Sequence, residues 1–279
     1  MAIANIDLSS WQDFASWVST RRTSIFRGQL KASWPLVTSL DRLCLKNNIP
    51  NSERRDVEMA LLRDFKRAFH HYSSNTPRDD DDLEWLALMQ HHGAPTRLLD
   101  FTYSPFVAAY FAMEDADATE SKEEDRFIAV WAVNMNWLRS ASSAHFGAAG
   151  KVLAKRIPGY FGTDAESIHR ELLFQEPLVT GVMAANPFRI NERIRVQKGV
   201  FIAPGDVRHD FMDNFAELPG HEEVSNVVKL RLPASERPEA MESLHYMNIS
   251  RTTLFPGIDG YAQSLAKYHH LFSRRRPWN

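Results

Sequence analysis

The stretch EWLALMQHHGAPTRLLDFTYSPFVAAYFA, residues 84–112, constrains the fold more than any other part of the chain. Its first helix ends at Gly93, because glycine is the residue that most often terminates a helix. Residues 96–102 then form a predicted strand. Ser104 and Pro105 begin a second helix, since a hydroxyl caps free N–H groups and proline fits the first turn. This stretch therefore carries a predicted strand between two predicted helices.

Helix signals dominate the first half of the chain and strand signals the second. Ser10 and Ser52 are predicted helix N-caps, because each precedes apolar residues at helical spacing. The predicted strands are residues 24–29, 96–102, 127–133, 172–174, 178–179, 194–196, 200–203 and 227–232. This segregation of helices and strands predicts an α+β protein rather than a regular parallel sheet.

Composition restricts the class of function. The chain has 279 residues, 44% of them hydrophobic, which suits a globular protein with a core. Its 33 Lys+Arg residues nearly balance its 35 Asp+Glu residues, so we expect neither nucleic acid nor a membrane surface as a partner. Residues 1–279 are predicted to be a single domain, and the basic tail at 273–279 is predicted to be solvated.

The expected location is the cytoplasm. Cys44 is the one cysteine of the chain, so no internal disulfide forms and a reducing compartment is indicated. The first residues carry neither a basic segment nor an apolar one, which argues against a signal peptide. No apolar run approaches the length of a membrane span.

Arg27 is unexpected because it lies in the otherwise apolar predicted strand at residues 24–29. Two interpretations are open. Arg27 either faces water from an edge strand, or it faces a cleft and holds an anion there. In the second case Gly28 would let the ligand approach the backbone.

Thr102 and Ser104 lie where the predicted strand passes into a helix. Free N–H groups and the helix dipole favour an anionic or polar ligand at such a position. The alternative is that Ser104 only caps the helix and Thr102 only shapes the turn. Gln90 and His91 precede them in the same polar segment, and one histidine of the pair at residues 91–92 is a candidate to line a pocket. Adjacent histidines on a helix point in different directions, so we predict no metal site.

Four sequence blocks, taken together, resemble the FRG domain family. They are FRGQ, MQHHGAPTRLLDFTYSPFVAAYFA, RIRVQKGVFIA and TTLFPGIDG, and they fall within residues 11–266.

The layout is also similar to that of ADP-ribosyltransferases of the arginine-serine-glutamate type, and this resemblance implies a split-sheet core and NAD as substrate. Arg27 would hold a cofactor phosphate or ribose, and Thr102 and Ser104 would support the nicotinamide half. Gln197, before a glycine as in the family pattern, would take the place of the catalytic glutamate. A further set of residues is assigned to the cofactor: Gly28, Gln90, His91 and Arg97.

Gln197 departs from the family pattern because an amide carries no charge to stabilise a ribosyl cation. Loss of one such contact costs about 3 kcal/mol, or about a hundredfold in rate. Asp100 and Glu171 are candidate replacements. One hypothesis is therefore an NAD-cleaving or ADP-ribose-transferring enzyme, acting as a toxin or phage-defence effector. The other is a non-catalytic module that binds a nucleotide or a protein.

Two geometric expectations follow. Arg27, Thr102, Ser104 and Gln197 are expected to line one cleft. Asp100 is expected to face away from Leu99 and to pair with Arg97 or Arg27, because strand residues alternate between faces and a buried charge needs a partner.

Overall fold

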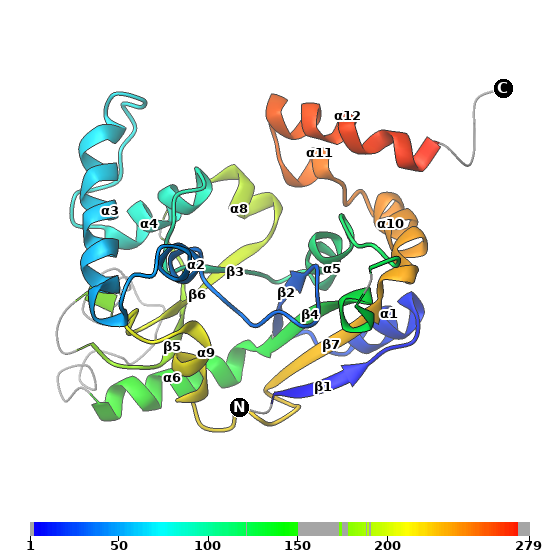
Figure 1. The fold of residues 1–279 in the computed structure, drawn as a ribbon, viewed down its shortest axis with the longest axis horizontal. Coiled ribbons are helices and arrows are strands. Elements are labelled where there is room, and N and C mark those ends of the chain that lie inside the picture. Colours follow the sequence, from blue (N-terminus) through cyan, green and yellow to red (C-terminus); the bar gives the residue numbers. More distant parts are fainter. Residues whose placement is uncertain are drawn as a thin grey trace.

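A computed structural model describes residues 3–120, 122–149, 173–174, 178–187, 189 and 191–272 of the protein. In these residues, seven strands form one mixed sheet in the order β1-β7-β4-β2-β3-β6-β5 (Figure 1). The strands are β1 (Ala4–Asp7), β2 (Ser24–Gln29), β3 (Leu99–Thr102), β4 (Phe127–Asn134), β5 (Val182–Ala185), β6 (Gly199–Pro204) and β7 (Val227–Pro233). β1 and β7 are parallel, and the other neighbouring pairs are antiparallel.

Helices cover the sheet and extend from it, and Figure 1 shows α3 and α4 beside one end and α1, α5 and α10 beside the other. The helices in the described residues are α1 (Trp11–Ser19), α2 (Ser39–Lys46), α3 (Arg54–Phe69), α4 (Asp82–His91), α5 (Pro105–Met113), α6 (Met135–Ala149), α8 (Glu192–Val196), α9 (Phe211–Ala216), α10 (Arg237–Tyr246), α11 (Arg251–Leu254) and α12 (Ile258–Phe272). Short 3-10 helices occur at Asn51–Glu53, Glu123–Arg126 and Ala234–Glu236. Among the described residues, none of the helices combines the length and the apolar character that crossing a bilayer requires.

The sheet is nearly divided between β2 and β3. β2 and β4 pair along the whole of β2, from Ser24 opposite Asn134 to Gln29 opposite Ala129. β2 and β3, in contrast, pair only at Phe26 opposite Thr102. The structure is thus mixed α/β with one sheet, in which the parts β1-β7-β4-β2 and β3-β6-β5 meet at a single residue pair.

Each part of the sheet has its own helical cover. Helices α1, α5 and α10 pack on one face of β2, β4 and β7. Helices α3 and α4 pack on β5 and β6. A third apolar cluster joins the two parts, because Ile25 and Trp131 meet Leu99 and Phe101 beneath α6 and α9.

Gly28 brings α5 against β2. A Cβ atom at this position would lie 1.9 Å from the Ala108 carbonyl oxygen and 2.8 Å from the Ala112 nitrogen. The missing side chain therefore admits the helix backbone. The space expected for a ligand beside Gly28 is filled by α5, which corrects that part of the prediction. On α5, Val107, Ala108 and Tyr110 are buried, whereas Phe106 is only partly buried.

Several predicted elements agree with the structure. The predicted strand at residues 24–29 is β2 with the same bounds, and Ser10 caps α1 by accepting a hydrogen bond from the Asp13 nitrogen. Ser104 likewise caps α5.

Other predictions were wrong. Residues 194–196 belong to helix α8 because the Asn191 side chain caps its first turn. Ser52 lies in a 3-10 helix, and α3 begins after it without a side-chain cap. Residues 178–179 form no strand, and residues 173–174 are helical. Strands occur in both halves of the chain, since β1 to β4 all end by Asn134.

Candidate functional site

Arg27 lies at the point where β2 and β3 separate. If the two strands continued to pair, Gly28 would lie opposite Asp100. Instead, Arg27 Nη1 donates a hydrogen bond of 2.7 Å to the backbone carbonyl of Asp100. The same nitrogen lies 4.0 Å from Asp100 Oδ2, which confirms the expected pairing of Asp100 with Arg27. The arginine side chain thus occupies the gap in the sheet.

The Asp100 carboxylate is held in place and accessible. It faces away from the buried Leu99, as expected, and its side chain is 60% exposed. Gln90 Nε2 donates a 2.8 Å hydrogen bond to Asp100 Oδ2, and Gln90 Oε1 accepts one of 2.6 Å from Thr96 Oγ1. Because an ionised carboxylate only accepts hydrogen bonds, the Gln90 NH₂ group is the end directed at Asp100, and the Gln90 oxygen accepts from Thr96.

Thr102, Ser104 and Gln197 also come together. Thr102 Oγ1 donates to the Gln197 carbonyl at 2.6 Å and accepts from the Ser104 nitrogen at 3.0 Å. Ser104 Oγ accepts from the Val107 nitrogen at 3.3 Å, which is the helix-cap role considered above. Gln197 follows α8, and its Nε2 donates to the Leu254 carbonyl at 2.9 Å. Each of these three side chains therefore forms at least one hydrogen bond within the protein.

Arg97 has a different environment from the one predicted. Its guanidinium is 1% exposed and forms a two-pronged ion pair with Glu58 on α3. It also donates to the Pro204 carbonyl at 3.2 Å and lies 4.9 Å from the centre of the Phe174 ring. Such a buried, fully paired arginine joins α3 to the sheet and offers no group to a cofactor.

The electrostatic balance at the junction is positive. Burial lowers the pKa of Arg27, the Asp100 carboxylate opposes that shift, and Arg42 adds to it. Burial also lowers the pKa of Arg193 on α8, with Asp100 again opposing. We define the junction cluster as Arg27, Gln90, His91, Asp100 and Arg193. One carboxylate thus acts on two arginines, and this excess of positive charge favours an anion.

Two buried atoms of the junction cluster have no hydrogen-bond partner in the described part of the chain: Arg27 Nε and His91 Nδ1. Buried polar atoms are nearly always bonded, so each is a position for a ligand or a water molecule. Burial lowers the pKa of His91, as do His92 and Arg193, which favours a neutral imidazole at neutral pH.

A family model matches this region. Residues 22–121 match the model of the FRG domain. This match covers 100 of the 279 residues. The match runs from before β2 to beyond α5, and it includes Arg27, Gln90, His91 and Asp100. No curated protein and no solved structure matches the chain.

The FRG-domain match ends before α8, whereas the structure adds α8 to the junction. Sequence reasoning assigned no role to Arg193, although the block RIRVQKGVFIA begins with it. The arginine was visible in that block, but a role for it could be assigned only once the structure placed α8 near Asp100. Glu171, the other carboxylate proposed from sequence, lies outside the described residues, as does the basic tail at 273–279.

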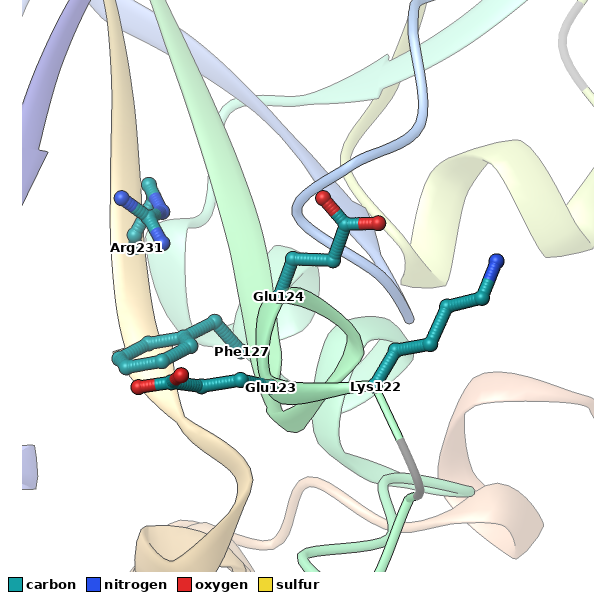
Figure 2. Close-up of a pocket in the computed structure, with 5 residues that line it drawn as sticks. All are labelled: Lys122, Glu123, Glu124, Phe127 and Arg231. Atoms are coloured by element: carbon teal, nitrogen blue, oxygen red, sulfur yellow. The ribbon is translucent and has the colours of Figure 1, made fainter.

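A shallow depression of about 580 Å³ occurs elsewhere, at the start of β4. Figure 2 shows Glu123 beside the Phe127 ring, with Lys122 and Glu124 extending away from it. Arg231 is engaged with the Phe127 ring and with Asp7. These side chains do not converge on one point, so the depression lacks the geometry of a binding site. In the described residues, no group of three or more His, Cys, Asp or Glu side chains is arranged to hold a metal ion.

Proposed function

We propose that the FRG domain binds NAD at the junction cluster and cleaves its nicotinamide–ribose bond, with Asp100 as the catalytic carboxylate. The observation that carries this proposal is the position of an exposed carboxylate beside Arg27, held there by Gln90. The arginine suits a phosphate of the dinucleotide because its planar guanidinium donates two parallel hydrogen bonds. The likeness to ADP-ribosyltransferases is part of this proposal.

The chemistry requires a negative charge near the ribose. The bond between nicotinamide and ribose C1′ breaks, and its electron pair leaves with nicotinamide. The ribose becomes an oxocarbenium-like cation, which the Asp100 carboxylate stabilises. Water, or a nucleophile on an acceptor, then bonds C1′ and releases a proton. With water the products are ADP-ribose and nicotinamide.

Asp100 replaces Gln197 in this role. The Gln197 amide is engaged with the Leu254 carbonyl and carries no charge, whereas the Asp100 carboxylate is accessible. Thr102 and Ser104 then act as supports that fix the start of α5 beside the site. Arg97 contributes only indirectly, because its ion pair with Glu58 holds α3 against the sheet.

The alternative is a module that binds a nucleotide or a protein without catalysis. One observation favours it: the side chains of Thr102, Ser104 and Gln197 each form a hydrogen bond within the protein. These residues correspond to the positions that contact nicotinamide and ribose in the resembling enzymes. A binding module would use the arginines to hold the ligand but would not cleave NAD.

The deciding experiment measures binding and nicotinamide release separately. Calorimetry with NAD and with ADP-ribose gives the affinities, and chromatography of the reaction gives the nicotinamide released. Asp100→Asn should lower the rate of release by about a hundredfold, because one electrostatic contact in the transition state is lost. The matched control is Asp64→Asn on α3. The Asp64 side chain is 65% exposed, and Asp64 is not part of the junction cluster.

Each outcome has a distinct meaning. Wild-type protein that binds NAD without releasing nicotinamide supports the binding module. Release that is unchanged by Asp100→Asn excludes Asp100 as the catalytic carboxylate. If neither NAD nor ADP-ribose binds at millimolar concentration, both nucleotide proposals fail and a protein-binding role remains.

An NAD-cleaving domain would also deplete the cell of NAD, which is how it would act as a toxin or a phage-defence effector. Expression of the wild type in bacteria should then arrest growth and lower cellular NAD. Asp100→Asn should relieve both effects at equal expression. Growth arrest that persists with normal NAD levels would reject this route to toxicity.

A further inference from the structure

We infer that Arg193 is a second anion-binding residue, which together with Arg27 makes the junction cluster selective for a diphosphate over a monophosphate. This inference rests on the proposed nucleotide function and identifies the part of the ligand that the site recognises. Neither the FRG-domain match nor the motif comparison assigns a role to Arg193, because the match ends at residue 121.

Arg193 is a partly buried cation held against an aromatic ring. It lies on α8, is partly buried, and places its guanidinium carbon 4.6 Å from the centre of the Phe255 ring. Stacking on an aromatic ring holds the planar group in one orientation. In the described part of the chain, its guanidinium forms neither an ion pair nor a hydrogen bond. A partly desolvated cation of this kind gains most from an anionic ligand.

Two neighbouring arginines differ from Arg193, because each of them has a carboxylate partner. Arg251 also stacks on Phe255, at 4.8 Å, but it is neutralised by Glu114 Oε1 at 2.7 Å. Arg195, two residues along α8, is 67% exposed and lies 3.6 Å from Glu192. Among the described arginines of α8 and α11, Arg193 is thus the one that forms no ion pair with a carboxylate.

The position of Arg193 relative to Arg27 suggests the ligand. Arg27 approaches Asp100 from β2 on one side of β3, whereas α8 leads into β6 on the other side of β3, where Thr102 bonds the Gln197 carbonyl at the end of α8. In keeping with this arrangement, the Asp100 carboxylate acts on the charge of both arginines. Arg193 also acts on His91, whose Nδ1 is buried without a partner among the described residues. A diphosphate presents two charged groups and engages both arginines, whereas a monophosphate engages one. One additional charge-assisted hydrogen bond contributes enough binding free energy to give the diphosphate a measurably higher affinity than the monophosphate.

The test compares inorganic pyrophosphate, orthophosphate and ADP-ribose by calorimetry at one fixed ionic strength. Wild-type protein should bind pyrophosphate at least about tenfold more tightly than orthophosphate, since one more charge-assisted hydrogen bond is made. Arg193→Gln should weaken pyrophosphate and ADP-ribose by about tenfold and orthophosphate by less than about threefold. The matched control Arg195→Gln removes a charge from the same helix and should leave all three affinities unchanged.

Phe255→Leu and Arg193→Lys serve as second variants. Phe255→Leu keeps the charge and removes its support, so the loss of pyrophosphate affinity should be intermediate. Arg193→Lys keeps the charge and loses the planar fork, and it too should reduce the preference for pyrophosphate. Melting temperatures establish that each variant is folded.

The outcomes separate this inference from the proposed function. If the wild type binds NAD and ADP-ribose but Arg193→Gln binds them equally well, the inference on Arg193 fails and the proposed function stands. If Arg193→Gln weakens all three ligands equally, the selectivity for a diphosphate is wrong. If the wild type binds none of the three ligands, both proposals are overturned.

Discussion

The guanidinium of Arg27 donates a hydrogen bond to the backbone carbonyl of Asp100, at 2.7 Å, across the separation of β2 and β3. Because the two strands pair only at Phe26 and Thr102, this side chain takes the place of the next backbone bond between them. An arginine in an apolar strand thus marks the division of the sheet. It also brings a cation beside the one carboxylate that acts on both Arg27 and Arg193.

The close approach of α5 to β2 depends on Gly28. Gly28→Ala should lower the free energy of unfolding by about 3 kcal/mol, because the new methyl group would overlap the Ala108 carbonyl and force the helix away. Urea denaturation measures this change. Gly93→Ala is the control: Gly93 has a φ of +81° but no atom within 4 Å of the added methyl group. Its cost should be only about 1 kcal/mol, from backbone strain. Equal losses in the two variants would contradict the packing role of Gly28.

The buried ion pair between Arg97 and Glu58 should stabilise the packing of α3 on the sheet. Glu58→Gln or Arg97→Met alone should lower the free energy of unfolding by about 3–5 kcal/mol, because each leaves a buried charge without its partner. The double variant Glu58→Leu/Arg97→Met should lose much less than the sum of the single losses. Denaturant titration of all variants gives the coupling. Strict additivity would show that the two side chains do not depend on each other.

Gln197→Glu tests whether residue 197 takes part in chemistry. The Gln197 amide donates to the Leu254 carbonyl, and a carboxylate there would face that carbonyl oxygen without a proton to share. We expect the free energy of unfolding to fall by about 1–3 kcal/mol, with no gain in nicotinamide release. Gln197→Met removes the donor without adding charge and should cost less. Faster release from a fully stable Gln197→Glu protein would instead assign the catalytic position to residue 197.

His91 should make stability depend on pH. Burial first, and then His92 and Arg193, lower its pKa in the folded state below the ordinary value of 6.5. Between those two values the unfolded chain binds the proton and the folded chain does not. The free energy of unfolding therefore falls as the pH decreases through about 6.5. Urea denaturation at pH 7.5 and 5.5 should show a smaller loss for His91→Gln than for the wild type. Identical losses would mean that His91 titrates normally.

Short-range chemistry in the sequence determined much of the fold. The apolar run at residues 24–29 became β2, and Ser10 and Ser104 became helix caps, because each depends on neighbours within a few residues. The FRGQ and QHHGAPTRLLDFT motifs likewise identified the family from residues 22–121. The sequence predicted Arg97 or Arg27 as the partner of Asp100, and the structure shows that the partner is Arg27.

Only the tertiary structure decided how the remaining polar residues are used. Arg97 and Asp100 lie in one short segment, yet Arg97 pairs with Glu58, 39 positions away, whereas Asp100 meets Arg27, 73 positions away. Residues 194–196 look like a strand in isolation, but the Asn191 cap makes them helical and brings Arg193 toward Asp100. The physical reason is that the partner of a buried charge is chosen by the packing of whole helices and strands, and local propensity carries no information about that packing.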